Sequence, residues 1–320
     1  MKKYVIGIDL GGTNCRFGVV TADGKLLKQE IVPTSKDRTQ EGIVNFLSGQ
    51  IERLKSEYPD VAGVGIGAPG IVDFERGVIV KSPHYSDWKG FPLKTDLSKA
   101  AGLPVILDND GNMIARGEGW QGAGKGLKNF VMMTLGTGIG GGIVINGEVF
   151  HGDLGFAGEI GHIVINFNGK VCECGGRGCW ENIVSSEGVR YLMSKSDDPN
   201  KEKFLEQFNG EVDKVSAKKL HAMAEDGDIF ASGIWRNFGA YLGAGIASLV
   251  NVLGINTFII GGGLSSAWNF FIAEAKREIP KRTYKETAAL IDLKRAALGE
   301  AAGIIGAAKQ AITLVFKEDK

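Results

Sequence analysis

The first 120 residues alternate short apolar runs with segments of helical periodicity. The runs predict strands over residues 4–9, 16–21, 26–32, 61–67 and 103–107. A turn signal, Ala22-Asp23-Gly24-Lys25, follows the second of these runs and predicts a hairpin. Apolar residues such as Ile43, Leu47 and Ile51 recur at helical spacing, so we expect an amphipathic helix over residues 41–57. A further helix is expected over residues 112–120.

The same order of elements restarts near residue 129. A strand over 129–135 leads into a glycine loop over 136–142, a strand over 143–145 and an Asn146-Gly147 turn. The segments Asp9-Leu10-Gly11-Gly12-Thr13 and Thr134-Leu135-Gly136-Thr137-Gly138 correspond, at an offset of 125 residues. This weak repeat predicts two related α/β halves with a ligand between them. A helix over 228–253, a strand over 257–260 and a helix from about Glu300 are expected further along.

The composition restricts the class of partner. Lys plus Arg and Asp plus Glu each total 37 among 320 residues, so the formal net charge is zero. A neutral chain offers no electrostatic argument for binding nucleic acid or an anionic membrane, and small ligands are the better expectation. No apolar stretch reaches the ~18 residues of a membrane span. An acid, Asp9, falls within the first apolar run, which indicates a strand, not a targeting signal, and predicts a cytoplasmic protein.

Three glycine clusters follow apolar strands, at residues 11–12, 136–142 and 261–263. Glycine lets backbone amides approach phosphate oxygens closely, although tight turns explain most single clusters. The hydroxyls of Thr13 and Thr137 suit phosphate contacts. None of the clusters has the P-loop pattern. Residues 136–141 have the spacing of a dinucleotide fingerprint, but they lead into a strand instead of a helix, which argues against that reading.

Three of the four cysteines fall within eight residues, as Cys172, Cys174 and Cys179, and His162 stands ten positions before them. Three thiolates and one imidazole form a closed tetrahedral set that is typical of structural zinc. Disulfides are a poorer explanation in a cytoplasmic chain, and free thiols are the remaining alternative. The fourth cysteine, Cys15, is expected to serve packing.

Several polar residues remain ambiguous from the sequence. Glu159 and Glu181 bracket the cysteine cluster, and they are either solvated surface acids or carboxylates that a metal-fixed loop holds toward sugar hydroxyls. Asp110 follows a buried strand, where it could act as a base or cap the next helix, and Asp108 competes with it for the role of base. Three histidines have no partner in sequence and are expected at the surface or in packing: His84, His151 and His221.

Taken together, the motifs resemble those of the ROK family (repressors, open reading frames and kinases) of the actin-like ATPase/hexokinase superfamily. The resemblance rests on Asp9–Thr13, Gly67–Gly70, Leu107–Asp110, Leu135–Gly142, Gly158–His162, Cys172–Cys179 with Glu181, and Leu298–Gly303. It implies two actin-like (ribonuclease H-like) α/β domains with an active-site cleft between them. The domains are expected over residues 1–116, joined by a C-terminal helix at 300–320, and over residues 117–299, which carry the zinc loop.

The resemblance also implies an ATP-dependent sugar kinase and assigns roles to residues. Asp110 would be the catalytic base. The sugar would be bound by Gly70, Asn109, Asp110, Glu159, His162 and Glu181. Asp9 would position Mg²⁺, the phosphates of ATP would meet Gly11, Gly12, Thr13, Gly136, Thr137 and Gly138, and adenosine would lie at Gly261, Gly262 and Gly263. Structural Zn²⁺ would be held by His162, Cys172, Cys174 and Cys179, and a homodimer or homotetramer is expected.

Two departures from the family pattern bear on substrate and nucleotide. Ser82-Pro83-His84-Tyr85 stands where Ser-Pro-Asn-Leu is frequent, and Asn14 stands where a lysine is common. Glucose is the expected substrate, with an N-acetylhexosamine, mannose or fructose as alternatives. A sugar-sensing regulator is the alternative of another class, but the first glycine loop begins near residue 9, which leaves little room for a preceding DNA-binding domain.

Overall fold

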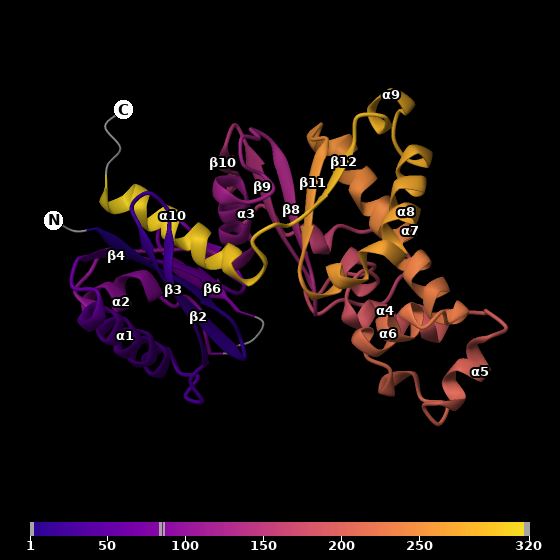
Figure 1. Cartoon of the computed structure of the whole chain (residues 1–320), viewed down its shortest axis with the longest axis horizontal. Helices are drawn as coiled ribbons and strands as arrows, with labels where there is room; N and C mark the ends of the chain where they lie inside the picture. The colour runs from indigo at the N-terminus through magenta and orange to yellow at the C-terminus, as the bar shows by residue number, and fades with distance from the viewer. Residues whose placement is uncertain (1–2, 83–84, 86, 317–320) are drawn as a thin grey trace. The chain divides into compact units, whose positions relative to one another are not determined.

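The structure is a computed structural model that describes residues 3–82, 85 and 87–316 (Figure 1). The strands are β1 (Tyr4–Leu10), β2 (Asn14–Thr21), β3 (Leu26–Pro33), β4 (Val61–Ala68), β5 (Ile71–Asp73), β6 (Val78–Lys81), β7 (Val105–Asn109), β8 (Phe130–Leu135), β9 (Ile139–Ile145), β10 (Glu148–Val149), β11 (Thr257–Gly261) and β12 (Asp292–Arg295). The α-helices are α1 (Gln40–Glu57), α2 (Leu93–Ala101), α3 (Asp110–Gln121), α4 (Ser186–Lys195), α5 (Lys201–Glu206), α6 (Ala217–Glu225), α7 (Ile229–Leu253), α8 (Trp268–Glu278), α9 (Lys285–Ala288) and α10 (Ala302–Val315).

Two five-stranded sheets organise these elements, in the orders β3-β2-β1-β4-β7 and β10-β9-β8-β11-β12. The chain forms two compact units. The first unit comprises Met1–Met132, Gly142–Gly158 and Ala296–Lys320, and the second comprises Met133–Gly141 and Glu159–Arg295. The domain limits expected from the sequence, 1–116 with 300–320 and 117–299, stay a prediction. No helix in the described ranges is long and apolar enough to cross a membrane.

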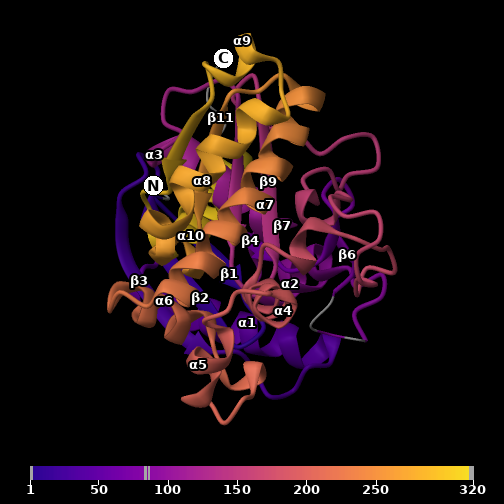
Figure 2. The same cartoon turned by 90° about the vertical axis from the view of Figure 1, so that its right-hand side faces the viewer.

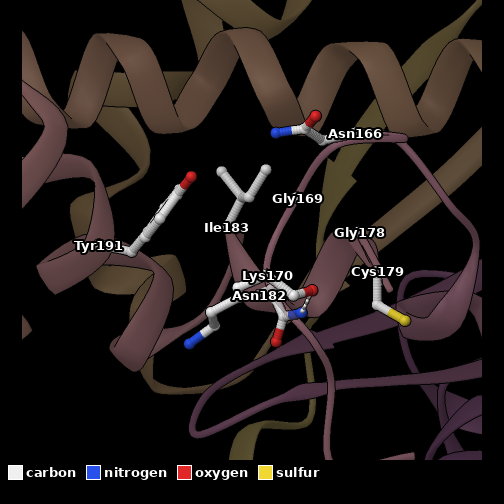
Figure 3. A pocket seen from close by; sticks show the side chains of 8 residues that line it. All are labelled: Asn166, Gly169, Lys170, Gly178, Cys179, Asn182, Ile183 and Tyr191. Atoms are coloured by element: carbon white, nitrogen blue, oxygen red, sulfur yellow. Dashed lines mark hydrogen bonds between the residues drawn. The ribbon is translucent and has the colours of Figure 1, made fainter. Parts of the chain in front are cut away.

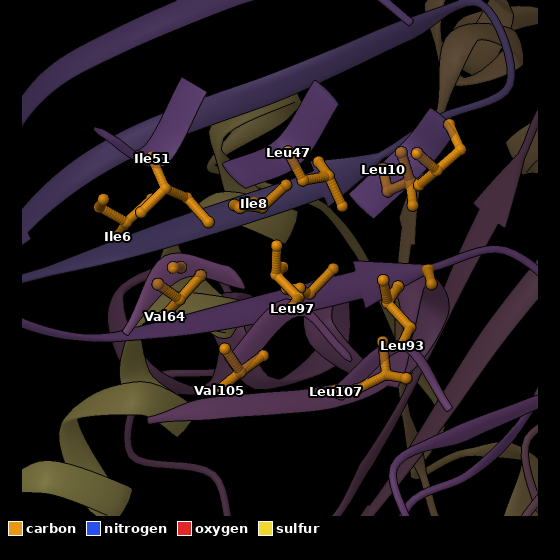
Figure 4. Packing of buried hydrophobic residues seen from close by; sticks show 14 of the residues in the cluster. Ile6, Ile8, Leu10, Leu47, Ile51, Val64, Leu93, Leu97, Val105 and Leu107 are labelled. Atoms are coloured by element: carbon orange, nitrogen blue, oxygen red, sulfur yellow. The ribbon is translucent and has the colours of Figure 1, made fainter. Parts of the chain in front are cut away.

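In the first unit, the sheet is covered on both faces. Strand β1 runs antiparallel to β2 and parallel to β4, which in turn runs parallel to β7. Because side chains alternate across a strand, Ile6, Ile8 and Leu10 share one face, where they belong to the same buried cluster as residues of α1 and α2 (Figure 4). Val5 shares the opposite face with Gly7 and packs in a cluster with residues of α10.

Glycines allow α10 to approach this second face closely. A Cβ at Gly7 or Gly65 would overlap backbone atoms of Ile304 or Ala307, respectively. Helix α10 also crosses α3 at short range, since a Cβ at Gly306 would overlap the backbone of Met113. Figure 1 shows α10, in yellow, lying along the first sheet. The C-terminal helix is therefore part of the first unit, although it is far from that unit in sequence.

In the second unit, α7 and α8 pack side by side (Figure 2). Their contact again depends on glycine, because a Cβ at Gly239 would overlap the backbone of Phe271, and a Cβ at Gly243 would lie within 3.0 Å of backbone atoms of Ala275. Buried aromatic rings, including Trp235, Phe238 and Phe271, fill the space beside these helices.

Two of the element boundaries that differ from the sequence-based expectation lie next to candidate site residues. The glycine loop expected over 136–142 is shorter, because β9 begins at Ile139. Gly140 and Gly142 serve packing within the strand: a Cβ at Gly140 would overlap the Thr134 hydroxyl, and one at Gly142 would crowd Ala115. Helix α3 begins at Asp110, two residues earlier than expected, because the side chain of Asn109 caps it.

We predict that Gly65→Ala lowers the free energy of unfolding by about 2 kcal/mol or more, since its Cβ would meet helix backbone that has no room to move. The matched control is Gly49→Ala in α1, where a Cβ meets nothing within 4 Å. That change is expected to stabilise the protein by about 0.5–1 kcal/mol. Urea unfolding of both variants is the measurement, and equal stabilities would contradict the packing described.

Candidate active site

The turn between β7 and α3 holds three polar residues that the sequence singled out. The Asn109 side chain accepts the backbone N–H of Asn112 at 3.2 Å and donates to the carbonyl of Gly70 at 3.0 Å. The carboxylate of Asp110 accepts the backbone N–H of Gly111 at 2.9 Å. The helix cap is therefore Asn109 and not Asp110, which stands as the first residue of the helix, at the carboxyl end of the parallel strand β7.

Asp108 has a different environment from Asp110. It is 1% exposed, and its oxygens accept hydrogen bonds from the Asn109 backbone, the Asn112 amide and the His151 ring, at 2.7, 2.9 and 2.9 Å. A carboxylate that is this enclosed, with hydrogen bonds on both oxygens, is out of reach of a substrate hydroxyl. Of the two acids, Asp110 is thus the better candidate for a base.

The first glycine loop is held by its carbonyl groups. The Thr34 hydroxyl and the Tyr85 hydroxyl donate to the Gly11 carbonyl at 2.8 and 3.3 Å, and Arg38 donates to the Gly12 carbonyl at 2.7 Å. The guanidinium of Arg38 is exposed and stacks 5.0 Å from the Tyr85 ring centre. The sequence did not indicate Arg38 as a site residue, because nothing in its neighbours links it to a loop 26 residues earlier.

Asp9 lies at the carboxyl end of β1, beside this loop. Its carboxylate is 3.4 Å from Arg16, which also contacts Glu300 at 3.2 Å. Burial raises the pKa of Asp9, while the charge of Arg16 opposes that rise. A nearby divalent cation would favour the ionised form, so the carboxylate suits a metal that accompanies phosphate.

In the second unit, the two remaining glycine segments come together. Gly262 has φ of +84° and packs so tightly on Leu135 that a Cβ would overlap its backbone. The neighbouring loop, Gly136–Gly138, leaves Thr137 exposed. Ser186 donates to the Gly136 carbonyl through its backbone N–H and its hydroxyl, at 2.8 and 3.0 Å.

Glu181 ties the cysteine loop to this glycine loop. Its carboxylate accepts the backbone N–H of Ile139 at 2.8 Å, and the absence of a side chain at Gly138 provides the space, because a Cβ there would overlap the same carboxylate. Glu181 therefore has a partner within the protein and is not a solvated surface acid.

The four expected metal ligands converge. Their donor atoms all lie within 4.8 Å of one another: His162, Cys172, Cys174 and Cys179. Cys174 Sγ is 3.6 Å from Cys179 Sγ, far longer than the ~2.05 Å of a disulfide and close to the spacing of two thiolates on one tetrahedral zinc. Burial, together with the neighbouring thiols, raises the pKa of Cys179 to about 12, so three thiolates at this spacing need a cation.

Local backbone hydrogen bonds build the cysteine loop. The N–H of Cys172 donates to the Gly176 carbonyl, and that of Gly178 donates to the Lys170 carbonyl. Trp180, which follows the last cysteine, is fully buried and donates from its ring to the Tyr241 carbonyl at 2.9 Å. These bonds define the path of the backbone around the cysteine side chains.

His162 presents its two nitrogens to different partners. Nδ1 lies 3.7 Å from Cys172 Sγ, and Nε2 lies 3.8 Å from the Glu159 carboxylate. Nδ1 thus faces the expected metal position, whereas Nε2 faces the carboxylate of Glu159. Burial raises the pKa of Glu159, His162 lowers it and the charge of Glu181 raises it.

A small recess beside the cysteine loop offers no substrate site, because it holds no volume that a water molecule could occupy. Figure 3 shows its lining, in which the Asn182 amide donates to the Lys170 carbonyl. Cys179 contributes to the wall, but its sulfur points away from Asn182 and Ile183.

The histidines divide into two kinds. His221 packs near Trp235 and Phe270 and lies 3.6 Å from Glu225 on its own helix, as expected of a packing residue. His151 instead contacts the buried Asp108, a partner 43 residues away that no sequence pattern indicates. His84 lies outside the described residues.

The fold and these clusters place the protein in the class of actin-like two-domain α/β proteins. A family model described as the ROK family matches residues 5–313. The chain therefore belongs to the ROK family.

A glucokinase of Halalkalibacterium halodurans is 36% identical over 309 residues, which cover 95% of this chain and 93% of that protein. A ROK family glucokinase of Streptomyces griseus, solved in complex with glucose and AMPPNP, is 35% identical with a TM-score of 0.81, and the match covers 97% of this chain and 99% of that one. A putative xylose repressor of Caldicellulosiruptor is 33% identical over 88% of this chain and 71% of the repressor.

We predict that Gly138→Ala breaks the hydrogen bond between Glu181 and the Ile139 backbone, because the new methyl group would occupy the space of the carboxylate. A bond to a charged acceptor contributes about 1.5–3 kcal/mol, so amide exchange at Ile139 should accelerate at least about tenfold. Gly263→Ala, whose Cβ meets nothing within 4 Å, is the control. Unchanged exchange at Ile139 in Gly138→Ala would show that Glu181 does not hold this loop.

Proposed function

We propose that this protein is an ATP-dependent hexose kinase that transfers the γ-phosphate of ATP to glucose and forms glucose 6-phosphate. The observation that carries the proposal is the similarity, over 97% of the chain, to a glucokinase solved with glucose and AMPPNP. Asp110 at the end of β7, the glycine loops and the cysteine–histidine cluster support it. An N-acetylhexosamine, mannose and fructose are the alternative substrates.

Asp110 is proposed as the general base that takes the proton of the attacking sugar hydroxyl. Its place at the end of β7, on the first turn of α3, suits a group that acts at the edge of a parallel sheet. The sugar is proposed to contact Gly70, Asn109, Asp110, Glu159, His162 and Glu181. Carboxylate, amide and imidazole groups match sugar hydroxyls because each hydroxyl both donates and accepts.

The nucleotide is proposed to bind at Asp9 and at the glycine segments. Asp9 would position Mg²⁺, which when bound supplies charge to the phosphates. The phosphates would contact Gly11, Gly12, Thr13, Gly136, Thr137 and Gly138, and adenosine would lie at Gly261, Gly262 and Gly263. Arg38 places an exposed guanidinium on the first loop, where Asn14 contributes no charge.

Zinc is proposed as a structural ion held by His162, Cys172, Cys174 and Cys179. With four protein ligands the coordination is complete, so the ion has no open position for substrate. Its contribution would be to fix the loop that carries Glu159, His162 and Glu181.

We propose that the protein acts in the cytoplasm, where it binds ATP and a sugar and binds neither nucleic acid nor a membrane. A homodimer or homotetramer remains the expected assembly. A sugar-responsive regulator is the second candidate, because the chain is 33% identical to a putative xylose repressor. Retention of sugar binding without any phosphoryl transfer would favour that candidate.

Asp110→Asn is expected to reduce kcat with glucose by at least ~10²-fold, the lower end of general acid–base catalysis, with little change in glucose affinity. Asparagine keeps the acceptor for the Gly111 N–H, so folding should be preserved. ADP release is measured with glucose, mannose, fructose, N-acetylglucosamine and N-acetylmannosamine. The exposed Asp292→Asn is the matched control, and turnover of Asp110→Asn within tenfold of the control would remove Asp110 from the role of base.

Metal analysis is expected to find one zinc ion per chain. Cys174→Ser should lose the zinc and lower Tm, because binding energy for a structural metal contributes directly to folding. Cys15→Ala, at a buried cysteine outside the cluster, should keep full zinc content. Well-folded wild-type protein with far less than one zinc per chain would refute the proposal.

A further inference from the structure

The carboxylate of Asp108 lies directly behind the turn that carries Asn109 and Asp110. One oxygen, Oδ1, accepts the backbone N–H of Asn109 at 2.7 Å and the side-chain amide of Asn112 at 2.9 Å. The other oxygen, Oδ2, is 2.9 Å from Nε2 of His151. With 1% of its side chain exposed, Asp108 depends on these partners instead of water.

His151 is the partner that the rest of the turn cannot replace. Asn109 and Asn112 are neighbours of Asp108 in sequence, whereas His151 comes from the segment after β10. Among the described residues, His151 is also the single ion-pair partner found for Asp108, and it contacts the oxygen that Asn109 and Asn112 leave unbonded. As a neutral ring it still donates from Nε2, provided that the hydrogen is on that nitrogen.

The ring of His151 is itself held in a fixed orientation. It stacks on Phe74, with ring centres 4.3 Å apart and an angle of 15° between the planes. Its backbone carbonyl accepts the N–H of Ala157 at 2.9 Å. Phe74 follows β5, a few residues after Gly70, whose carbonyl anchors the side chain of Asn109. Two sides of the turn are therefore braced by neighbouring segments.

We propose that His151 is a positioning residue for phosphoryl transfer: it fixes the rotation of the Asp108 carboxylate and thereby the Asn109–Asp110 turn. While Nε2 holds Oδ2, the other oxygen faces the Asn109 N–H, and the orientation of the next residue, Asp110, follows. Removing the donor leaves a buried oxygen unsatisfied and frees the carboxylate to rotate. This inference rests on the proposed role of Asp110 as base, and a base displaced by about 1 Å can cost up to about 10²-fold in rate.

The test compares substitutions that keep or remove the donor. His151→Leu should lower kcat with glucose at least tenfold and leave KM for ATP within twofold of the wild-type value. In His151→Gln, the side-chain amide nitrogen reaches the position of Nε2, so kcat should return to within about threefold of wild type. His151→Asn places its amide nitrogen near the position of Nδ1, too short to reach Asp108, and should behave like His151→Leu.

The matched control is His221→Leu, which removes a packing histidine whose ion-pair partner, Glu225, lies on the same helix. Urea unfolding of each variant measures the loss of stability, and kcat is then compared at equal stability loss. The inference fails if His221→Leu lowers kcat as much as His151→Leu, if His151→Gln and His151→Asn have the same kcat, or if His151→Leu keeps full turnover. Should His151→Leu not fold, the Gln and Asn pair decides by itself.

Asp110→Asn is measured in parallel, so that failure of the role of His151 can be distinguished from failure of the kinase proposal. If Asp110→Asn loses all turnover while His151→Leu keeps normal turnover, the role of His151 is overturned and the kinase proposal stands. Absence of turnover in the wild-type protein with every sugar overturns the kinase proposal, and the positioning role with it.

Discussion

The close contact of α10 with the first sheet and with α3 is the constraint on which the first unit depends. Helix backbone packs directly on strand backbone at Gly7 and Gly65, and helix backbone packs on helix backbone where Gly306 meets Met113. Any side chain at these positions would force the layers apart. The same contact brings Gly303 against the carboxylate of Asp9, so the helix that completes the core also forms a wall of the candidate cation site.

Carboxylates that accept protein hydrogen bonds recur in the structure. Glu118 on α3 is fully buried and accepts backbone N–H groups from Ala123, Ala297 and Leu298 at 2.7–3.1 Å. It thereby fixes the segment that leads into α10. Asp108 holds the turn before α3, and Glu181 holds the start of β9. Asp108 and Glu118 are stable inside the protein because backbone or side-chain donors replace water, and the half-buried Glu181 likewise accepts a backbone N–H.

Much of the fold was accessible from sequence because it depends on local patterns. The strands expected over 4–9, 26–32, 61–67 and 257–260, together with α1 and α7, lie within a residue of the predicted bounds, and the spacing of the cysteines alone predicted a metal site. The predicted length of the second glycine loop was wrong. Gly140 and Gly142 lack side chains because Thr134 and Ala115 pack against them, and a linear sequence pattern does not show these contacts. Likewise, the choice between base and cap at Asp110 stayed open until the side chain of Asn109 was seen to cap the helix.

Sequence by itself determined the order of the elements, the donor set of the proposed zinc site and membership of the ROK family, because each is written in residue type and spacing over short distances. Only the tertiary structure decided which of two neighbouring acids is enclosed, that His151 meets Asp108, that Arg38 lies on the first glycine loop and that Glu181 holds Ile139. These contacts join residues 26–43 positions apart, and they exist only after separate strands, helices and loops have packed. Packing also determines how deeply each charged group is buried, and burial shifts its pKa. A local sequence pattern does not show this.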